Sequence, residues 1–94
     1  MQGVIIFIII KEMVKYFMKD VYKMNYIKLG LKISYYRKIC GMTQEELAEA
    51  IDKNAAFIGH IEAPNIPTAI SLDTLFDIAG VLSVPAYKFL DFDD

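Results

Sequence analysis

Twenty residues in the middle of the chain, 43–62, constrain the fold most; they read TQEELAEAIDKNAAFIGHIE. Thr43 and Glu46 have the spacing of a capping box, in which the Thr hydroxyl accepts an N–H of the first helical turn and the Glu carboxylate accepts the Thr N–H. Apolar side chains then recur at helical spacing, and acidic ones lie between them. The pattern predicts a short helix that begins after Thr43.

A second short helix is expected directly after the first. Asp52-Lys53-Asn54 interrupts the apolar pattern, and Asn54 is a favourable N-cap residue. Ile58 and Ile61 would then face inward, and Ala48 lies where the two helices approach most closely. Two short helices joined by a tight turn form a helix-turn-helix.

The rest of the chain after residue 25 also has helical patterns. A helix is predicted over residues 26–40, ended by Gly41, with a fourth helix after Ser71 and a short fifth helix opened by Pro85. One side of the first helix carries Ile27, Leu31, Tyr35 and Ile39, flanked by Ile33 and Tyr36. The fourth helix is expected to face Leu72, Leu75, Phe76, Ala79 and Leu82 inward, and the fifth holds Tyr87, Phe89 and Leu90.

Residues 1–23 differ from the rest in composition. The run VIIFIII at residues 4–10 is β-branched and apolar, which is typical of a buried strand or of a strand that pairs with a second chain. It is too short to span a bilayer and lacks the features of a signal peptide. Residues 11–26 predict an amphipathic helix with Met13, Val14, Phe17, Met18 and Val21 on one face.

Two interpretations of this extension stay open. Met24 is a candidate initiator, in which case residues 1–23 are not translated. A translated extension would instead serve dimerisation, because an unpaired apolar strand aggregates. The expected organisation is therefore an extension, 1–23, which is a strand or a helix, and a helix-turn-helix domain, 24–94.

Charge is distributed unevenly along the chain. The formal net charge is −2 over 94 residues. Residues 25–42 contain four basic side chains and no acid, whereas Lys53 and Lys88 are the only basic residues after position 42. Any surface that attracts phosphate must come largely from the stretch before the helix-turn-helix.

The residue types that carry chemistry are few. One cysteine and one histidine allow neither an internal disulfide nor a metal cluster. Cys40 is expected to be a small buried side chain. The sequence contains no nucleophile–base pair and no glycine-rich phosphate loop, so we expect a protein that is not an enzyme and needs no cofactor. The expected location is the cytoplasm.

Three segments together, YYRKICGMTQEELAEAI, FIGHIE and SLDTLFDIAGVLSVPAYKFL, resemble the Xre/Cro-type family of phage-repressor-like DNA-binding domains. The resemblance covers about residues 26–90 and implies a compact, all-α, five-helix fold. It also implies an ion pair between Arg37 and Glu62, which would be a structural tie or, alternatively, a weak surface pair.

The resemblance further implies which residues contact DNA. Gln44, beside Thr43, would lie on the DNA backbone or else serve only as a good first-turn residue. The base-reading positions fall on Ala55, Ala56, Gly59 and His60, which offer few groups that reach base edges. The full set of candidate DNA contacts is Arg37, Lys38, Thr43, Gln44, Lys53, Asn54, Ala55, Ala56, Gly59, His60 and Asn65.

The expected function is a transcriptional regulator, a repressor, that binds double-stranded DNA as a homodimer and does not engage a membrane. The alternative is a protein-interaction or dimerisation module of the same fold, such as an antitoxin-like partner, with weak DNA binding. Three features favour this alternative. The helix after Asn54, which carries the base-reading positions and is called the recognition helix, has few polar groups, the second half of the chain is acidic, and the extension is apolar.

Overall fold

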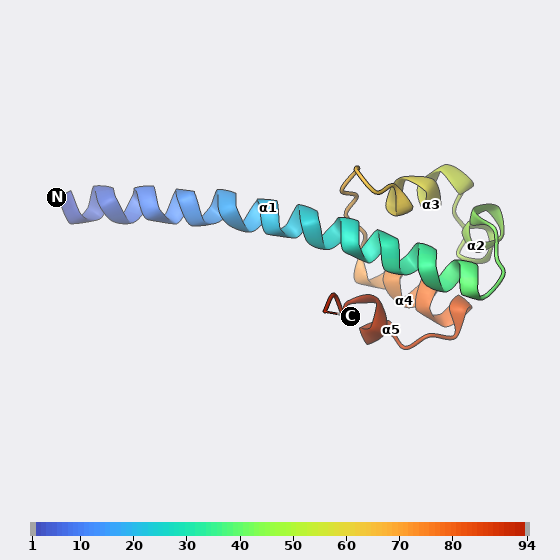
Figure 1. Ribbon diagram of the computed structural model, residues 1–94. Coiled ribbons are helices and arrows are strands. Elements are labelled where there is room, and N and C mark those ends of the chain that lie inside the picture. Colours follow the sequence, from blue (N-terminus) through green and yellow to red (C-terminus); the bar gives the residue numbers. More distant parts are fainter. Residues whose placement is uncertain (1, 94) are drawn as a thin grey trace.

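The computed structural model describes residues 2–93, which form five α-helices and no strand (Figure 1). The fold is all-α, as predicted from the sequence. The helices are α1 Gln2–Ile39, α2 Gln44–Ala50, α3 Ala55–Glu62, α4 Leu72–Leu82 and α5 Ala86–Phe89.

The N-terminal extension is helical, and it is part of the first helix of the domain. α1 runs unbroken for 38 residues, so the interpretation of residues 4–10 as a strand is wrong. A strand here would have no neighbour among the described residues to pair with its backbone, whereas a helix satisfies those groups internally. The helix passes through Met24 without interruption, and the expected boundary between 23 and 24 therefore lies inside one element.

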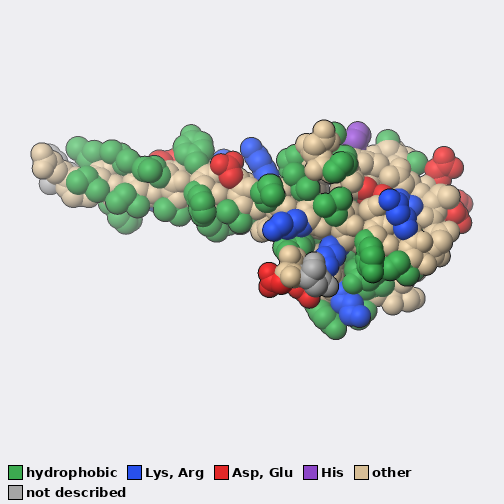
Figure 2. Space-filling view, in the orientation of Figure 1, with side chains coloured by type: hydrophobic (Ala, Val, Ile, Leu, Met, Phe, Trp, Pro, Cys, Tyr) green, Lys and Arg blue, Asp and Glu red, His purple; other side chains and the backbone are tan. Residues whose placement is uncertain are grey.

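The first half of α1 projects away from the rest of the molecule (Figure 1). The chain extends 59 Å along its longest axis against 26 and 22 Å along the others. The large apolar side chains from Val4 to Phe17 are 53–68% exposed, and they cover much of the projecting part in Figure 2. No helix in the described part of the chain combines the length and apolar character needed to cross a membrane.

The other helices pack on the C-terminal half of α1 (Figure 1). α1 buries Leu29 and Ile33, whereas Leu31, Tyr35 and Ile39, the side of the helix that the sequence pattern singled out, are 48, 58 and 62% exposed. Apolar residues occupy both sides of α1, so their spacing alone did not identify the buried side. The core residues are Leu29, Ile33, Leu47, Ala48, Ile51, Ile58, Ile61, Leu75, Ile78, Ala79, Leu82 and Phe89.

Gly30 identifies the side of α1 that the domain covers. A Cβ atom at Gly30 would collide with the backbone carbonyl of Ile61, near the end of α3. The backbones of α1 and α3 therefore meet at this point, and only a residue without a side chain fits there.

α4 and α5 close the other side of the core. Ser71 caps α4 by accepting the Thr74 N–H. Phe89 of α5 is fully buried, and its ring meets the Tyr36 ring edge-to-face at 5.1 Å between centroids. Leu72 and Phe76, which were expected to face inward, are instead exposed, and so is Cys40, which was expected to be buried. Tyr87 and Leu90 of the last helix are exposed as well.

Candidate nucleic-acid interface

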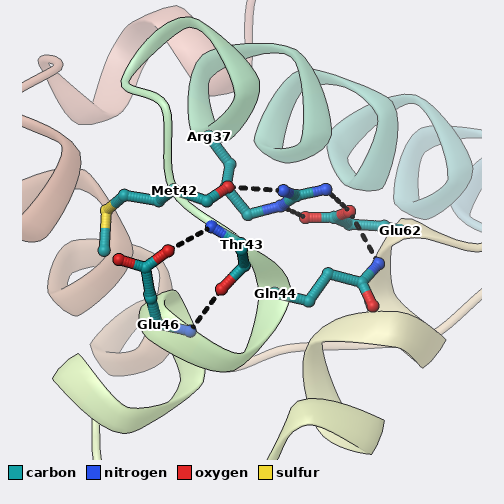
Figure 3. A network of polar contacts seen from close by, with 6 residues as sticks. All are labelled: Arg37, Met42, Thr43, Gln44, Glu46 and Glu62. Carbon is teal, nitrogen blue, oxygen red and sulfur yellow. Dashed lines mark hydrogen bonds and ion pairs between the residues drawn. The ribbon is translucent and has the colours of Figure 1, made fainter.

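The start of α2 is fixed by the predicted capping box (Figure 3). The Glu46 N–H donates to Thr43 Oγ1 at 3.0 Å, and the Thr43 N–H donates to Glu46 Oε1 at 3.1 Å. The bond from the Thr43 backbone is the main cause that lowers the pKa of Glu46.

The turn between α2 and α3 is held by backbone and side-chain bonds. Asp52 adopts a left-handed conformation with φ 59°, which Asp tolerates better than most residues. The Lys53 N–H donates to the Ala48 carbonyl at 2.8 Å. Asn54 caps α3 by accepting the Phe57 N–H at 2.9 Å. These bonds set the angle between the two helices.

Arg37 and Glu62 form a bidentate ion pair (Figure 3). Arg37 Nε and Nη2 donate to Glu62 Oε2 and Oε1, each at 2.7 Å, and Nη1 donates to the Met42 carbonyl at 2.7 Å. The hydrogen bond to Glu62 raises the pKa of Arg37. Arg37 is 7% exposed and Glu62 8%, so this pair is a buried tie between α1, the loop before α2 and the end of α3.

Gln44 joins the same cluster. Its Nε2 donates to Glu62 Oε1 at 3.1 Å (Figure 3). Its Oε1 lies 3.5 Å from where a Cβ at Gly59 would be. Gln44 is half-buried between α2 and α3. The structure therefore brings two candidate site residues, Gln44 and Gly59, together.

The candidate DNA contacts differ in their access to solvent. Arg37 is buried and its guanidinium donors are directed at Glu62 and Met42, so its side chain ties α1 to α3. Its contact with a phosphate stays a prediction. Half-buried candidates are Gln44, Ala55 and Gly59. Exposed candidates are Lys38, Thr43, Lys53, Asn54, Ala56, His60 and Asn65.

The exposed candidates come from five parts of the chain, of which the first is Thr43 at the start of α2. Lys38 is in the last turn of α1, Lys53 and Asn54 are in the turn, Ala56 and His60 are on α3, and Asn65 follows α3. The Lys53 ammonium lies 5.4 Å from the centroid of the Phe57 ring, a cation–π contact at the surface. Base edges are read by donors and acceptors, and on the exposed part of α3 only the His60 ring supplies them.

Thr68 is a residue of this region that sequence reasoning missed. Its hydroxyl donates to the His60 carbonyl at 3.1 Å, so that this carbonyl at the end of α3 accepts a second hydrogen bond beside the one from the Ala63 N–H. A threonine in a proline-rich loop carries no signal of such a role, because the contact depends on the path of the loop back to α3.

The electrostatics around the site oppose nonspecific DNA binding. Acidic side chains gather at the end of the molecule where α2 lies (Figure 2). Glu45, Glu46, Glu49 and Asp52 are all exposed there. Against them stand Lys38 and Lys53, so only a few phosphates can be neutralised. No three His, Cys, Asp or Glu side chains come together within residues 2–93 as a metal site.

A family model described as helix-turn-helix matches residues 29–89, from the first buried residue of α1 to the end of α5. The match covers about two thirds of the chain and includes α2, α3 and the tie at Arg37 and Glu62. No curated protein matches the chain in sequence.

Proposed function

Because the chain belongs to the helix-turn-helix family, a family of DNA-binding regulators, we propose that it is a transcriptional repressor that acts in the cytoplasm and binds a short palindromic duplex as a homodimer. The observation that carries the proposal is the cluster of Arg37, Gln44 and Glu62, which holds α3 rigidly against α1 and α2. A recognition helix must be positioned in this way before its few side chains can read a groove.

The proposed contacts divide into two groups. Lys38, Gln44, Lys53 and Asn65 contact the DNA backbone, with further contacts from Thr43 and Asn54 at the starts of α2 and α3. Ala55, Ala56, Gly59 and His60 face the bases. Gly59 and the two alanines permit a close approach and methyl contacts to thymine, and His60 donates to a base acceptor. Sequence-dependent DNA shape supplies the remaining specificity.

The experiment starts with a selection from random duplexes and continues with titrations of the selected site. We expect His60→Ala to cost about 1–3 kcal/mol of discrimination at one base pair, because it removes the base donor. Lys53→Ala should weaken binding to all duplexes alike and lower the salt slope by about 1, because it removes a phosphate contact. Lys88→Ala, on α5, is the matched control and should change neither quantity.

A second candidate function is a protein-interaction module, favoured by the exposed acids on α2. The two functions differ in what the folded protein does at low salt. Failure of the wild-type chain to bind any duplex at about 50 mM salt, where phosphate contacts are strongest, would refute the repressor and leave the module. Binding with a clear sequence preference would refute the module.

A further inference from the structure

α1 carries a continuous stripe of side chains on the side that faces away from the domain. Its residues are spaced alternately three and four apart, which is the heptad pattern of a helix that packs on another helix. We call this stripe the seam; it consists of Phe7, Ile10, Val14, Phe17, Val21, Met24, Lys28, Leu31 and Tyr35. All are exposed except Val21, which is half-buried, and all are apolar except Lys28.

The charged residues of the projecting half of α1 and the residues that the domain buries all lie off the seam, as they do in a helix that pairs with another helix. In the projecting half, the charged side chains all lie at other heptad positions; they are Lys11, Glu12, Lys15, Lys19, Asp20 and Lys23. The residues that the domain buries, Leu29, Gly30, Ile33 and Arg37, lie on the side opposite the seam. The domain therefore leaves most of the seam exposed, and only the C-terminal segment at Phe92 borders it.

The two ends of the seam differ in shape and in apolar surface, and each could cover the other. Near the domain the seam opens into a groove of about 470 Å³, lined by Lys28, Leu31, Lys32, Tyr35, Tyr36 and Phe92. At the other end, residues 4–10 are apolar on every side of the helix and more than half exposed. A helix that is hydrophobic all round needs cover on several sides, which a groove gives and a flat helix face does not.

We propose that two copies of the chain pair their α1 helices in antiparallel orientation through the seam, so that residues 4–10 of each copy lie in the groove of the other. The register is the one that places residues 4–10 in the groove, and it pairs every seam position except Tyr35, which lies beyond the paired stretch. It sets Phe7 opposite Leu31 of the second copy, Ile10 opposite Lys28, Val14 opposite Met24 and Phe17 opposite Val21. The inference rests on the homodimer of the proposed function and specifies its contact surface.

The antiparallel orientation follows from Lys28 and from residues 4–10. A parallel pair would set Lys28 against Lys28 of the second copy inside the seam, and it would leave both apolar ends without a groove. The antiparallel pair sets Lys28 against Ile10 near the end of the contact, where its ammonium reaches water. Burial of the exposed seam side chains on both copies covers on the order of 800 Å² per copy, the size of a stable interface.

The first test measures the oligomeric state of full-length variants by sedimentation equilibrium. Phe17 lies at the centre of the seam and is 66% exposed, whereas its neighbour Tyr16 is off the seam and 68% exposed. We expect Phe17→Lys to weaken dimerisation by at least about 100-fold and Tyr16→Lys to leave it unchanged. A monomeric wild type, or an equal effect of both substitutions, would overturn the proposal.

The second test determines the orientation by disulfide formation, with Cys40→Ser as the background. Val14 lies opposite Met24 of the second copy in the antiparallel pair, and opposite Val14 in a parallel one. The double variant Val14→Cys/Met24→Cys should form covalent dimers on oxidation, and Val14→Cys alone should not, because a disulfide needs Cα atoms within about 7 Å. Efficient crosslinking of Val14→Cys alone would overturn the antiparallel arrangement.

A lipid surface is the other environment that would cover residues 4–10, and flotation with phosphatidylcholine–phosphatidylglycerol vesicles tests it. A wild-type monomer that floats with the vesicles would overturn the proposal, whereas a dimer that stays unbound supports it. DNA binding is measured in parallel on the Phe17→Lys and Tyr16→Lys variants. A wild-type dimer that binds no duplex refutes the repressor function and leaves the seam. A wild-type monomer that binds duplex DNA refutes the seam and the homodimer but leaves the DNA binding of the proposed function.

Discussion

Glu62 accepts three hydrogen bonds from two residues, Arg37 and Gln44, at a position with almost no access to water. We expect Glu62→Ala to cost about 3–5 kcal/mol in free energy of unfolding, because it leaves the Arg37 guanidinium buried without its counter-charge. Urea denaturation measures the loss. Glu49→Ala, an exposed α2 residue, is the control and should stay within about 0.5 kcal/mol of wild type. A loss below about 1 kcal/mol for Glu62→Ala would show that the tie is not structural.

Gly30 and Gly80 offer a matched pair of substitutions, because both are helical and differ in the space around them. A Cβ at Gly30 would collide with the Ile61 carbonyl, whereas none of the residues described lies near a Cβ at Gly80. We expect Gly30→Ala to destabilise the protein by about 1–3 kcal/mol through the forced separation of α1 and α3. Gly80→Ala should stabilise it by about 0.5–1 kcal/mol through helix propensity. Thermal unfolding of the two variants measures both changes in stability. Changes of the same sign would contradict the packing described.

At the scale of the element, the start of α2 makes stability depend on pH. The folded state lowers the pKa of Glu46, so its carboxylate stabilises the fold fully above the unfolded value of about 4.5, and this contribution is lost as the pH falls through the lower folded pKa. Glu46→Gln does not titrate. The stability difference between wild type and Glu46→Gln should therefore decrease below about pH 4.5. Denaturation midpoints at several pH values measure it, and a constant difference from pH 3 to 6 would be the contrary result.

The ends of the helices were readable from the sequence because caps are local. Thr43 with Glu46, Asn54 and Ser71 each bond a residue three positions away, and the structure contains all of these bonds. The Arg37–Glu62 pair lies 25 residues apart and was expected only from the family resemblance. No local pattern indicates that Gln44 also bonds Glu62, or that Thr68 returns to the His60 carbonyl.

Two features of α1 could not be predicted from the sequence, namely which of its sides is buried and that its first turns are helical. Apolar residues line both sides of α1, and Gly30, which fixes the domain side, acts through a tertiary contact with Ile61. The β-branched residues of 4–10 prefer strands only where another strand pairs with them. No strand lies among the described residues, and the helix predicted to begin at residue 26 instead begins at Gln2 and includes residues 4–10.

At the scale of the whole molecule, the proposed antiparallel pair determines how far apart two recognition helices lie. α3 meets α1 at Gly30, and in the proposed register the two Gly30 residues are about 33 Å apart along the helix axis. This is close to the 34–36 Å of one DNA turn, and α3 lies at or beyond this point. We expect the selected operator to contain half-sites whose centres are at least one turn apart.

The Phe17→Lys variant provides the control for that spacing. It should bind single half-sites with no preference for their separation, because its copies bind independently. The measurement is the selection from random duplexes, run with the wild type and the variant. A shared spacing preference would show that the second copy is recruited by contacts other than α1.

Because α1 is unbroken from Gln2 to Ile39, the number of residues in it fixes the rotation of its projecting half relative to the domain. An insertion of one residue between Val14 and Gly30 would rotate the two parts of the helix by about 100° and separate them by about 1.5 Å. In the proposed pair, the part of the seam before the insertion would then turn toward the domain, and the two α3 helices would lose their common direction. An insertion of seven residues would restore the direction and lengthen the reach. Changes in the length of this one helix are therefore a route by which relatives of the chain could acquire operators with different spacing.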